Sequence, residues 1–121
     1  MKRVMLSFLG LLFAATLVLS AVLSGSAGSV NALAAEKGQR LFESKRCNMC
    51  HDVSTVGIEA TTKAAAMKGP DLVGIDQEVD WIVQFVKKEA ELEGKKHRGP
   101  YSGSDEDLRA IAEWIAAQKK E

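Results

Sequence analysis

The chain has no excess of positive charge. It contains 16 lysines and arginines and 16 aspartates and glutamates. Two of the basic residues, Lys2 and Arg3, stand at its very start, so the remainder is slightly acidic. Nucleic acids and anionic membrane surfaces attract clustered basic residues. The charge balance therefore predicts that neither is a partner of this protein.

Strand-forming patterns are missing beyond residue 34. No run there alternates valine, isoleucine or threonine with polar residues, and no internal repeat or low-complexity segment occurs. The pattern favours an all-α fold. A thioredoxin-like pair of cysteines normally lies in a βαβ unit, so the lack of strands argues against a redox dithiol.

Aromatic residues are few, at 6% of the chain. A small domain with so few large apolar side chains gains little stability from its core, and it usually needs a disulfide, a metal or a bound group. We expect residues 35–121 to form one domain of this kind.

A long apolar run occurs near the N-terminus. A basic start precedes an almost wholly apolar stretch over residues 4–23, and the tripeptide that ends at Ala34 fits the small-residue rule for signal cleavage. We predict that residues 1–34 are a signal peptide and that the mature protein is periplasmic or otherwise exported. Because about 20 apolar residues can span a bilayer, a retained N-terminal membrane anchor is the alternative.

The two cysteines stand in the sequence Cys47-Asn48-Met49-Cys50-His51, which has the CxxCH pattern of covalent haem attachment. Two thiols one helical turn apart can add to the two vinyl groups on one edge of a haem, and the next residue then faces the iron. The motif predicts one haem c with His51 as its proximal ligand. In an exported protein, attachment would also consume thiols that otherwise form a disulfide.

The same residues allow one other interpretation. Cys47, Cys50, His51 and His97 are the only cysteines and histidines of the chain, and four such ligands suffice for a zinc ion. The adjacency of Cys50 and His51 and the expected export argue against a zinc site.

The sequence predicts three helices. The first covers residues 35–46 and leads into the haem motif. The second covers residues 77–93, where apolar residues recur at helical spacing, and ends at Gly94. Residues 52–75 are expected to be loop. The third helix begins after Ser104, an N-cap followed by acidic residues, and its apolar face consists of Leu108, Ile111, Trp114 and Ile115.

With these features the chain resembles the small monohaem class I cytochrome c family over residues 36–121. In that family a glycine of the first helix permits close crossing by the last helix, and an aromatic residue packs nearby. Gly38, Phe42 and Trp114 fit those roles. The resemblance implies a cytochrome c-like fold of three main helices wrapped around one covalent haem.

The segment Gly69-Pro70-Asp71-Leu72-Val73-Gly74 is similar to the family's GPxLxG loop. In that loop the proline carbonyl accepts a hydrogen bond from Nδ1 of the proximal histidine. The resemblance therefore implies that Pro70 orients His51. Such a bond fixes the tautomer and raises the basicity of the ligand.

The sixth iron ligand departs from the family's usual pattern. The family usually places a methionine in the loop before the last helix, but no methionine follows Met67. The resemblance aligns His97 with the distal ligand, which predicts bis-histidine coordination. Met67 is the alternative, although it lies three residues from Pro70, where a backbone of about 10 Å leaves little slack to pass the haem edge. An open or water-bound iron is the third hypothesis.

We therefore expect a one-electron carrier and not an enzyme. A second imidazole in place of a thioether should lower the haem potential, and an iron with both axial positions filled leaves no place for a small-molecule substrate. The expected partners are other exported or membrane redox proteins. The alternative function is a haem-based sensor or minor peroxidase with a labile sixth position. Five basic residues would either steer an acidic partner or simply be solvated: Lys45, Arg46, Lys95, Lys96 and Arg98.

Overall fold

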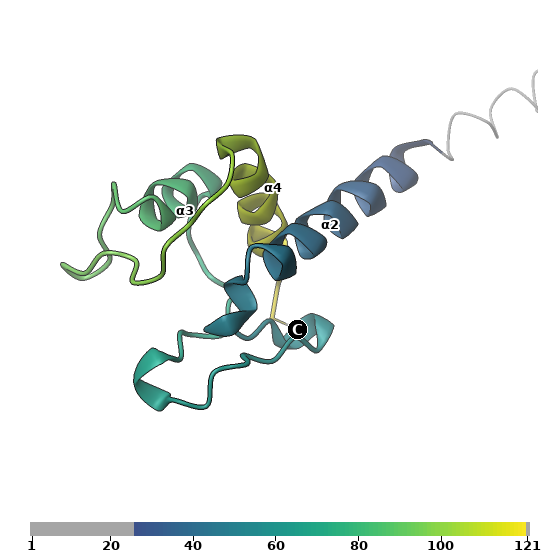
Figure 1. Cartoon of the computed structure of the whole chain (residues 1–121). Helices are drawn as coiled ribbons and strands as arrows, with labels where there is room; N and C mark the ends of the chain where they lie inside the picture. The colour runs from purple at the N-terminus through teal and green to yellow at the C-terminus, as the bar shows by residue number, and fades with distance from the viewer. Residues whose placement is uncertain (1–25, 121) are drawn as a thin grey trace, which may run out of the picture. The chain divides into compact units, whose positions relative to one another are not determined.

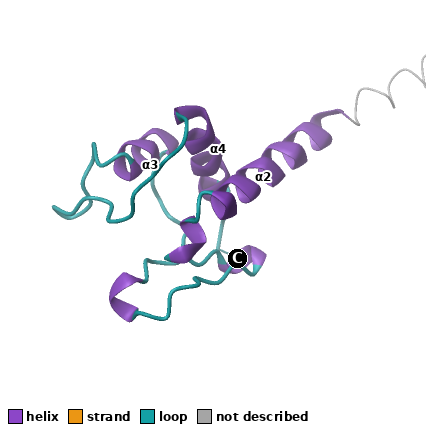
Figure 2. Cartoon of the chain, viewed as in Figure 1, coloured by secondary structure: helices purple, strands orange, loops and turns teal. Residues whose placement is uncertain are grey.

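The computed structural model describes residues 26–120, and this part of the chain is helical (Figures 1 and 2). No strand occurs within it, and the prediction of an all-α fold is confirmed. The α-helices are α2 (Ser26–Ser44), α3 (Val79–Val86) and α4 (Asp105–Ala116), and the segment between α2 and α3 holds the 3₁₀ turns η1 (Cys47–Met49), η2 (Ser54–Val56) and η3 (Ala65–Met67).

The predicted signal segment, residues 1–34, lies largely outside the described residues. Its last part belongs to α2, which starts earlier than the helix predicted over residues 35–46. By their internal contacts the residues form two units, 1–33 and 34–121. Within residues 26–120, no helix is both long enough and apolar enough to cross a membrane.

Helices α2 and α4 approach each other closely at Gly38. A Cβ atom on Gly38 would collide with the side chain of Trp114 and would come within 2.8 Å of the carbonyl oxygen of Ala110. The ring of Phe42 is buried, with its centroid 5.3 Å from that of Trp114 and the planes tilted by 54°. The close helix crossing that the resemblance implied at Gly38, Phe42 and Trp114 is therefore present.

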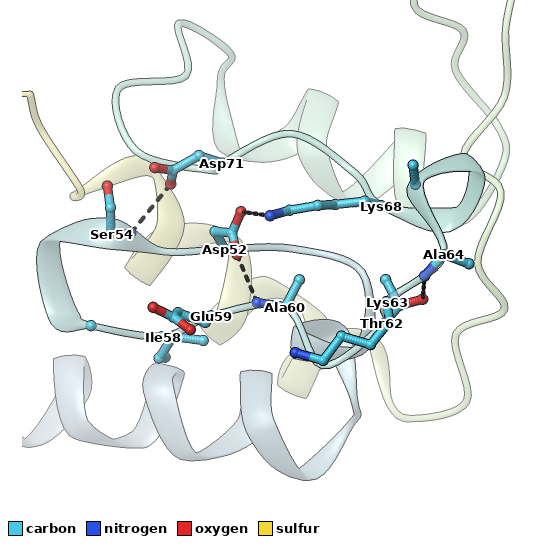
Figure 3. A pocket seen from close by; sticks show the side chains of 12 residues that line it. Asp52, Ser54, Ile58, Glu59, Ala60, Thr62, Lys63, Ala64, Lys68 and Asp71 are labelled. Atoms are coloured by element: carbon cyan, nitrogen blue, oxygen red, sulfur yellow. Dashed lines mark hydrogen bonds and ion pairs between the residues drawn. The ribbon is translucent and has the colours of Figure 1, made fainter.

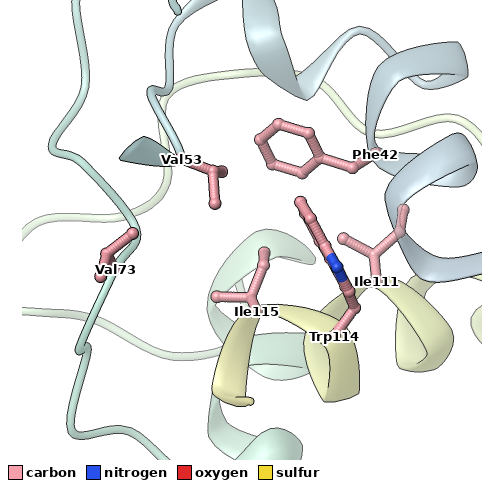
Figure 4. Packing of buried hydrophobic residues seen from close by; sticks show 6 residues of the cluster. All are labelled: Phe42, Val53, Val73, Ile111, Trp114 and Ile115. Carbon is pink, nitrogen blue, oxygen red and sulfur yellow. The ribbon is translucent and has the colours of Figure 1, made fainter. Parts of the chain in front are cut away.

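The hydrophobic core joins the helices to the loops between α2 and α3 (Figure 4). Val53 and Val73 come from those loops, two residues after His51 and three after Pro70, and both are buried. Each loop is thereby anchored next to a predicted site residue. The core cluster consists of Phe42, Val53, Val73, Ile111, Trp114 and Ile115.

Helix α4 begins as predicted. The side chain of Ser104 accepts a hydrogen bond from the backbone N–H of Asp107 at 3.1 Å, which satisfies one of the free N–H groups of the first turn. The face predicted to be apolar is buried; it consists of Leu108, Ile111, Trp114 and Ile115.

Helix α3 is shorter than predicted. It ends at Val86 rather than near residue 93, because Lys88 takes a left-handed backbone conformation with φ of 65°. The N–H of Glu89 then donates back to the carbonyl of Gln84 at 2.8 Å. The helical spacing of apolar residues continues past Val86, but the helix does not.

Gly94 serves a hairpin turn instead of ending a helix. Leu92 and Lys95 exchange backbone hydrogen bonds in both directions, at 2.9 and 3.0 Å. Between them Glu93 and Gly94 have φ of 51° and 73°. Positive φ at both central residues is the signature of a type I′ turn, which favours glycine.

We predict that Gly38→Ala destabilises the protein by about 1–3 kcal/mol, the usual cost of overpacking. Helix propensity alone would favour alanine over glycine by about 1 kcal/mol, so the collision with Trp114 reverses the expected sign. The free energy of unfolding by chemical denaturation measures the effect. Arg40→Ala, at an exposed position of the same helix, is the control and should change it by less than about 0.5 kcal/mol. An unchanged or raised stability for Gly38→Ala would contradict the close crossing.

Candidate functional site

The segment Cys47 to His51 folds as a tight turn directly after α2. Arg46 takes a left-handed conformation with φ of 64° and redirects the chain. The carbonyl of Cys47 then accepts hydrogen bonds from the N–H groups of Cys50 and His51, at 3.2 and 3.1 Å. The turn brings the two cysteines within one turn of each other, as thioether attachment requires.

Both thiols are free and half-buried. Cys47 packs against the core cluster, and this burial raises the pKa of its thiol to about 11. The thiolate is the form that attacks disulfides, so this burial argues against Cys47 as the reactive thiol of a redox dithiol. In residues 26–120, no three or more His, Cys, Asp or Glu side chains gather as a metal site; the zinc site considered from the sequence is not assembled.

His51 is held by the loop that contains Pro70. Its Nδ1 lies 2.9 Å from the carbonyl oxygen of Pro70. A carbonyl can only accept, so Nδ1 carries the proton and Nε2 of a neutral ring keeps its lone pair. The contact that the resemblance implied between Pro70 and His51 is thus present in the structure.

Gly69 lets this loop lie against the imidazole. Its N–H donates to the carbonyl of Cys50 at 2.7 Å, and a Cβ atom on it would lie 2.7 Å from Nδ1 of His51. Any side chain here would push the ring away from Pro70. The sequence marked Gly69 as part of a turn, and its contact with His51 was not predicted.

His97 stands opposite His51. The ring centroids are 6.1 Å apart and the planes differ by 15°. Nδ1 of His97 lies 3.1 Å from the carbonyl oxygen of Gly99, which again leaves Nε2 of the neutral ring as the lone pair. A metal bonded at about 2 Å to one nitrogen of each ring would separate the centroids by about 6.3 Å. The observed separation of 6.1 Å is close to that value.

Burial favours the neutral form of His97. It lowers the pKa of the imidazole, and the neighbouring charges of His51 and Lys88 act in the same direction, while the hydrogen bond to Gly99 opposes them. A metal ligand must be neutral imidazole. The surroundings of His97 therefore suit ligation.

Two further side chains fix the loop around His97, and neither was predicted to do so. The ring of Phe85 lies 5.5 Å from that of His97, nearly perpendicular at 77°. Arg98 donates from its guanidinium to the carbonyl of Ala66, in η3, at 2.8 Å. The signal for Phe85 in the sequence was its place, with Trp81, among the apolar residues that recur at helical spacing over residues 77–93.

Met67, the alternative sixth ligand, lies in η3 and is 57% exposed. The ring that faces His51 is that of His97.

A separate hollow lies beside the segment after His51 (Figure 3). Asp52 accepts a hydrogen bond from the N–H of Ala60 at 2.7 Å and pairs with Lys68 at 3.0 Å, and these two contacts lower the pKa of its carboxyl. Asp71 accepts from the N–H of Ser54 at 3.3 Å. These bonds order the loop, and none of the predicted ligands lines the hollow.

Of the five basic residues considered for steering a partner, two form contacts within the protein. Lys45 pairs with Asp107 at 3.5 Å, and Arg98 is bound to Ala66. Lys95 belongs to the hairpin turn after α3. The five residues therefore differ in their freedom to meet a partner.

Comparison with known proteins identifies the family of this chain. The model of the family described as cytochrome c oxidase, cbb3-type, subunit III, matches residues 33–115. Cytochrome c-551 of Stutzerimonas stutzeri is 27% identical over 96 residues, which cover 78% of this chain and 89% of that protein. No solved structure shows a significant match. The chain belongs to this family of small class I c-type cytochromes, which carry a covalently bound haem c and transfer electrons.

Proposed function

We propose that the protein is an exported one-electron carrier whose haem c is attached by Cys47 and Cys50 and ligated by His51 and His97. When bound, the haem supplies an iron that alternates between the ferric and ferrous states. The observation that carries the proposal is the pair of near-parallel imidazole rings with centroids 6.1 Å apart. Their separation fits two axial ligands of one iron.

On the proximal side, the hydrogen bond to Pro70 keeps His51 in one tautomer. The carbonyl of Pro70 accepts from Nδ1, which directs Nε2 to act as the ligand and makes the imidazole a stronger donor. Gly69 permits this contact because it has no side chain. Pro70 thus acts through His51 rather than on the haem itself.

The distal side determines the potential and the reactivity. Two imidazoles stabilise ferric iron more than an imidazole and a thioether do, so the reduction potential is low for this family. With His97 bound, no axial position is open to a substrate or a small gas. This favours electron transfer over the sensor or minor peroxidase function.

The expected partners are other exported or membrane redox proteins. Residues 1–34 would direct export and be cleaved after Ala34, which is supported by the basic start, the apolar stretch over residues 4–23 and the small-residue tripeptide that ends at Ala34. Retention of the N-terminal segment as a membrane anchor is the alternative outcome.

The denatured protein, purified from a host that assembles c-type cytochromes, should have the mass of residues 35–121 plus one haem. Thioether bonds to Cys47 and Cys50 survive denaturation, and cleavage after Ala34 sets the start. Mass spectrometry measures both. The double variant Cys47→Ser with Cys50→Ser is the control and should lose all covalent haem. A haem that extracts freely would refute attachment, and a full-length chain found only in membranes would support the anchor.

Gly69→Ala should raise the reduction potential and cost about 1–3 kcal/mol of stability, because the new Cβ displaces His51 from the carbonyl of Pro70. A weaker hydrogen bond makes His51 a poorer donor and so destabilises ferric iron. Redox titration of the haem measures the shift. Gly57→Asn is the control: Gly57 has φ of 70° and open space around it, and asparagine tolerates that conformation. An unshifted potential in a folded Gly69→Ala protein would count against the role of Pro70.

His97→Ala should open the iron to carbon monoxide in the ferrous state while the haem remains covalently attached. His97→Met should gain the sulfur-to-iron absorption band at the red end of the spectrum and shift the potential upward, since a thioether favours ferrous iron. Lys96→Ala, at the neighbouring exposed residue, should leave spectrum and potential unchanged. If His97→Ala retains the wild-type spectrum and potential, His97 is not the ligand, and Met67→Leu becomes the next variant to measure.

A further inference from the structure

We propose that Phe85 is a positioning residue that sets the orientation of the His97 imidazole, and thereby the near-parallel arrangement of the two axial rings. The inference rests on the proposed ligation by His97. It adds a residue of helix α3, outside the haem motif and both ligand loops, to those that determine the electronic state of the iron.

The first argument is the geometry of the contact. The rings of Phe85 and His97 have centroids 5.5 Å apart and planes at 77°, the edge-to-face arrangement that aromatic pairs prefer. An imidazole that turned about its Cβ–Cγ bond would lose this contact. The perpendicular ring of Phe85 therefore selects one plane for His97.

The second argument concerns where the restraint comes from. The hydrogen bond from Nδ1 of His97 goes to Gly99, two residues away in the same loop, and it moves with that loop. Phe85 lies on α3, which packs against α4. Ile82 of α3 is buried, and Asp80 forms an ion pair with Arg109 of α4 at 2.6 Å. Because α3 is fixed against α4, Phe85 restrains the orientation of the His97 ring relative to these two helices.

The third argument is that Phe85 is itself held in place. Trp81, one helical turn earlier, stacks on it with centroids 4.8 Å apart and planes at 12°. Both side chains are only half-buried, and neither belongs to the core cluster. The pair contributes little to the core, and its member Phe85 contacts His97. We therefore explain the pair by its effect on the orientation of His97.

The orientation has a measurable electronic consequence. In a ferric low-spin haem, near-parallel axial planes split the iron d orbitals and give a rhombic electron paramagnetic resonance spectrum. Near-perpendicular planes leave those orbitals nearly degenerate and give a spectrum dominated by one large g value. The 15° angle between His51 and His97 predicts a single rhombic spectrum for the wild-type protein.

The test is the ferric spectrum of the haem-loaded Phe85→Leu protein. Without the perpendicular ring, His97 should adopt a range of planes, so the single rhombic spectrum should broaden or split into more than one species. The apparent affinity of the ferrous protein for carbon monoxide should rise about two- to tenfold, the change that loss of an aromatic contact produces. Phe85→Tyr keeps the ring and should restore the wild-type spectrum.

Trp81→Leu is the matched control, because it makes the same kind of change one turn away on α3 and leaves Phe85 beside His97. It should lower stability and alter the rhombic spectrum less than Phe85→Leu does, because Trp81 acts on His97 only through Phe85. The proposal is overturned if Phe85→Leu keeps the wild-type spectrum, or if Trp81→Leu changes it equally. Should Phe85→Leu fail to fold, nuclear Overhauser contacts between the two rings in the ferrous wild-type protein decide the matter, and their absence also overturns it.

The spectra also distinguish a wrong ligand assignment for His97 from a wrong positioning role for Phe85. If His97 does not bind the iron, His97→Ala keeps the wild-type spectrum, and the wild-type protein shows no bis-imidazole signal. If His97 binds and Phe85 has no positioning role, the wild-type protein shows the bis-imidazole signal and Phe85→Leu leaves it unchanged.

Discussion

A proton on Nδ1 of each histidine is the constraint on which the site depends, because it leaves Nε2 free to bind iron. The structure imposes it twice in the same way. His51 is fixed by the carbonyl of Pro70 and His97 by that of Gly99. The chain has two prolines, and each follows a glycine, as Gly69-Pro70 and Gly99-Pro100. Proline restricts the backbone before it, and glycine allows that backbone to lie against a ring: a Cβ on Gly99 would stand 3.3 Å from Cε1 of His97. Each histidine thus has a Gly-Pro pair beside it that supplies the carbonyl for Nδ1. The backbone lies closer to the ring at Gly69 than at Gly99.

These loops keep their positions because the small core extends into them. Val53 and Val73 are buried in the same cluster as Phe42 and Ile115, so the segments that follow His51 and Pro70 are each tied to the α2–α4 pair. That pair can come close enough only because position 38 has no side chain. A domain with so few aromatic residues gains stability from every such contact, and the bound haem adds a further apolar surface to pack against. Loop geometry and core packing are therefore not separable in this protein.

Several features of the fold and the site could be predicted from the sequence because they depend on the spacing of nearby residues. The CxxCH motif, the Ser104 cap and the buried face of α4 each follow from residues within a few turns of one another. The end of α3 was predicted wrongly, since Ala90 continues the helical spacing while Lys88 and Glu93 adopt positive φ, which lysine and glutamate rarely do. The contacts of Phe85 with His97, and of Arg98 with Ala66, join segments far apart in the chain. The helical spacing places Phe85 on the same face of α3 as Trp81, but it does not predict which residue that face contacts.

The contacts that hold the loop around His97 influence whether the haem can exchange ligands or only transfer electrons. The loop is held at His97 by Phe85 from α3, at Arg98 by the carbonyl of Ala66 from η3, and within itself by Gly99. A sensor or peroxidase needs a ligand that leaves readily, so that a gas or peroxide can take its place. A carrier needs ligands that stay when the charge of the iron changes, because every atom that moves adds to the barrier for the electron. The two attachments from other segments, Phe85 of α3 and Ala66 of η3, oppose release of His97, and the same attachments keep the reorganisation small. On the proposed ligation by His97, these attachments favour electron transfer over the admission of a substrate.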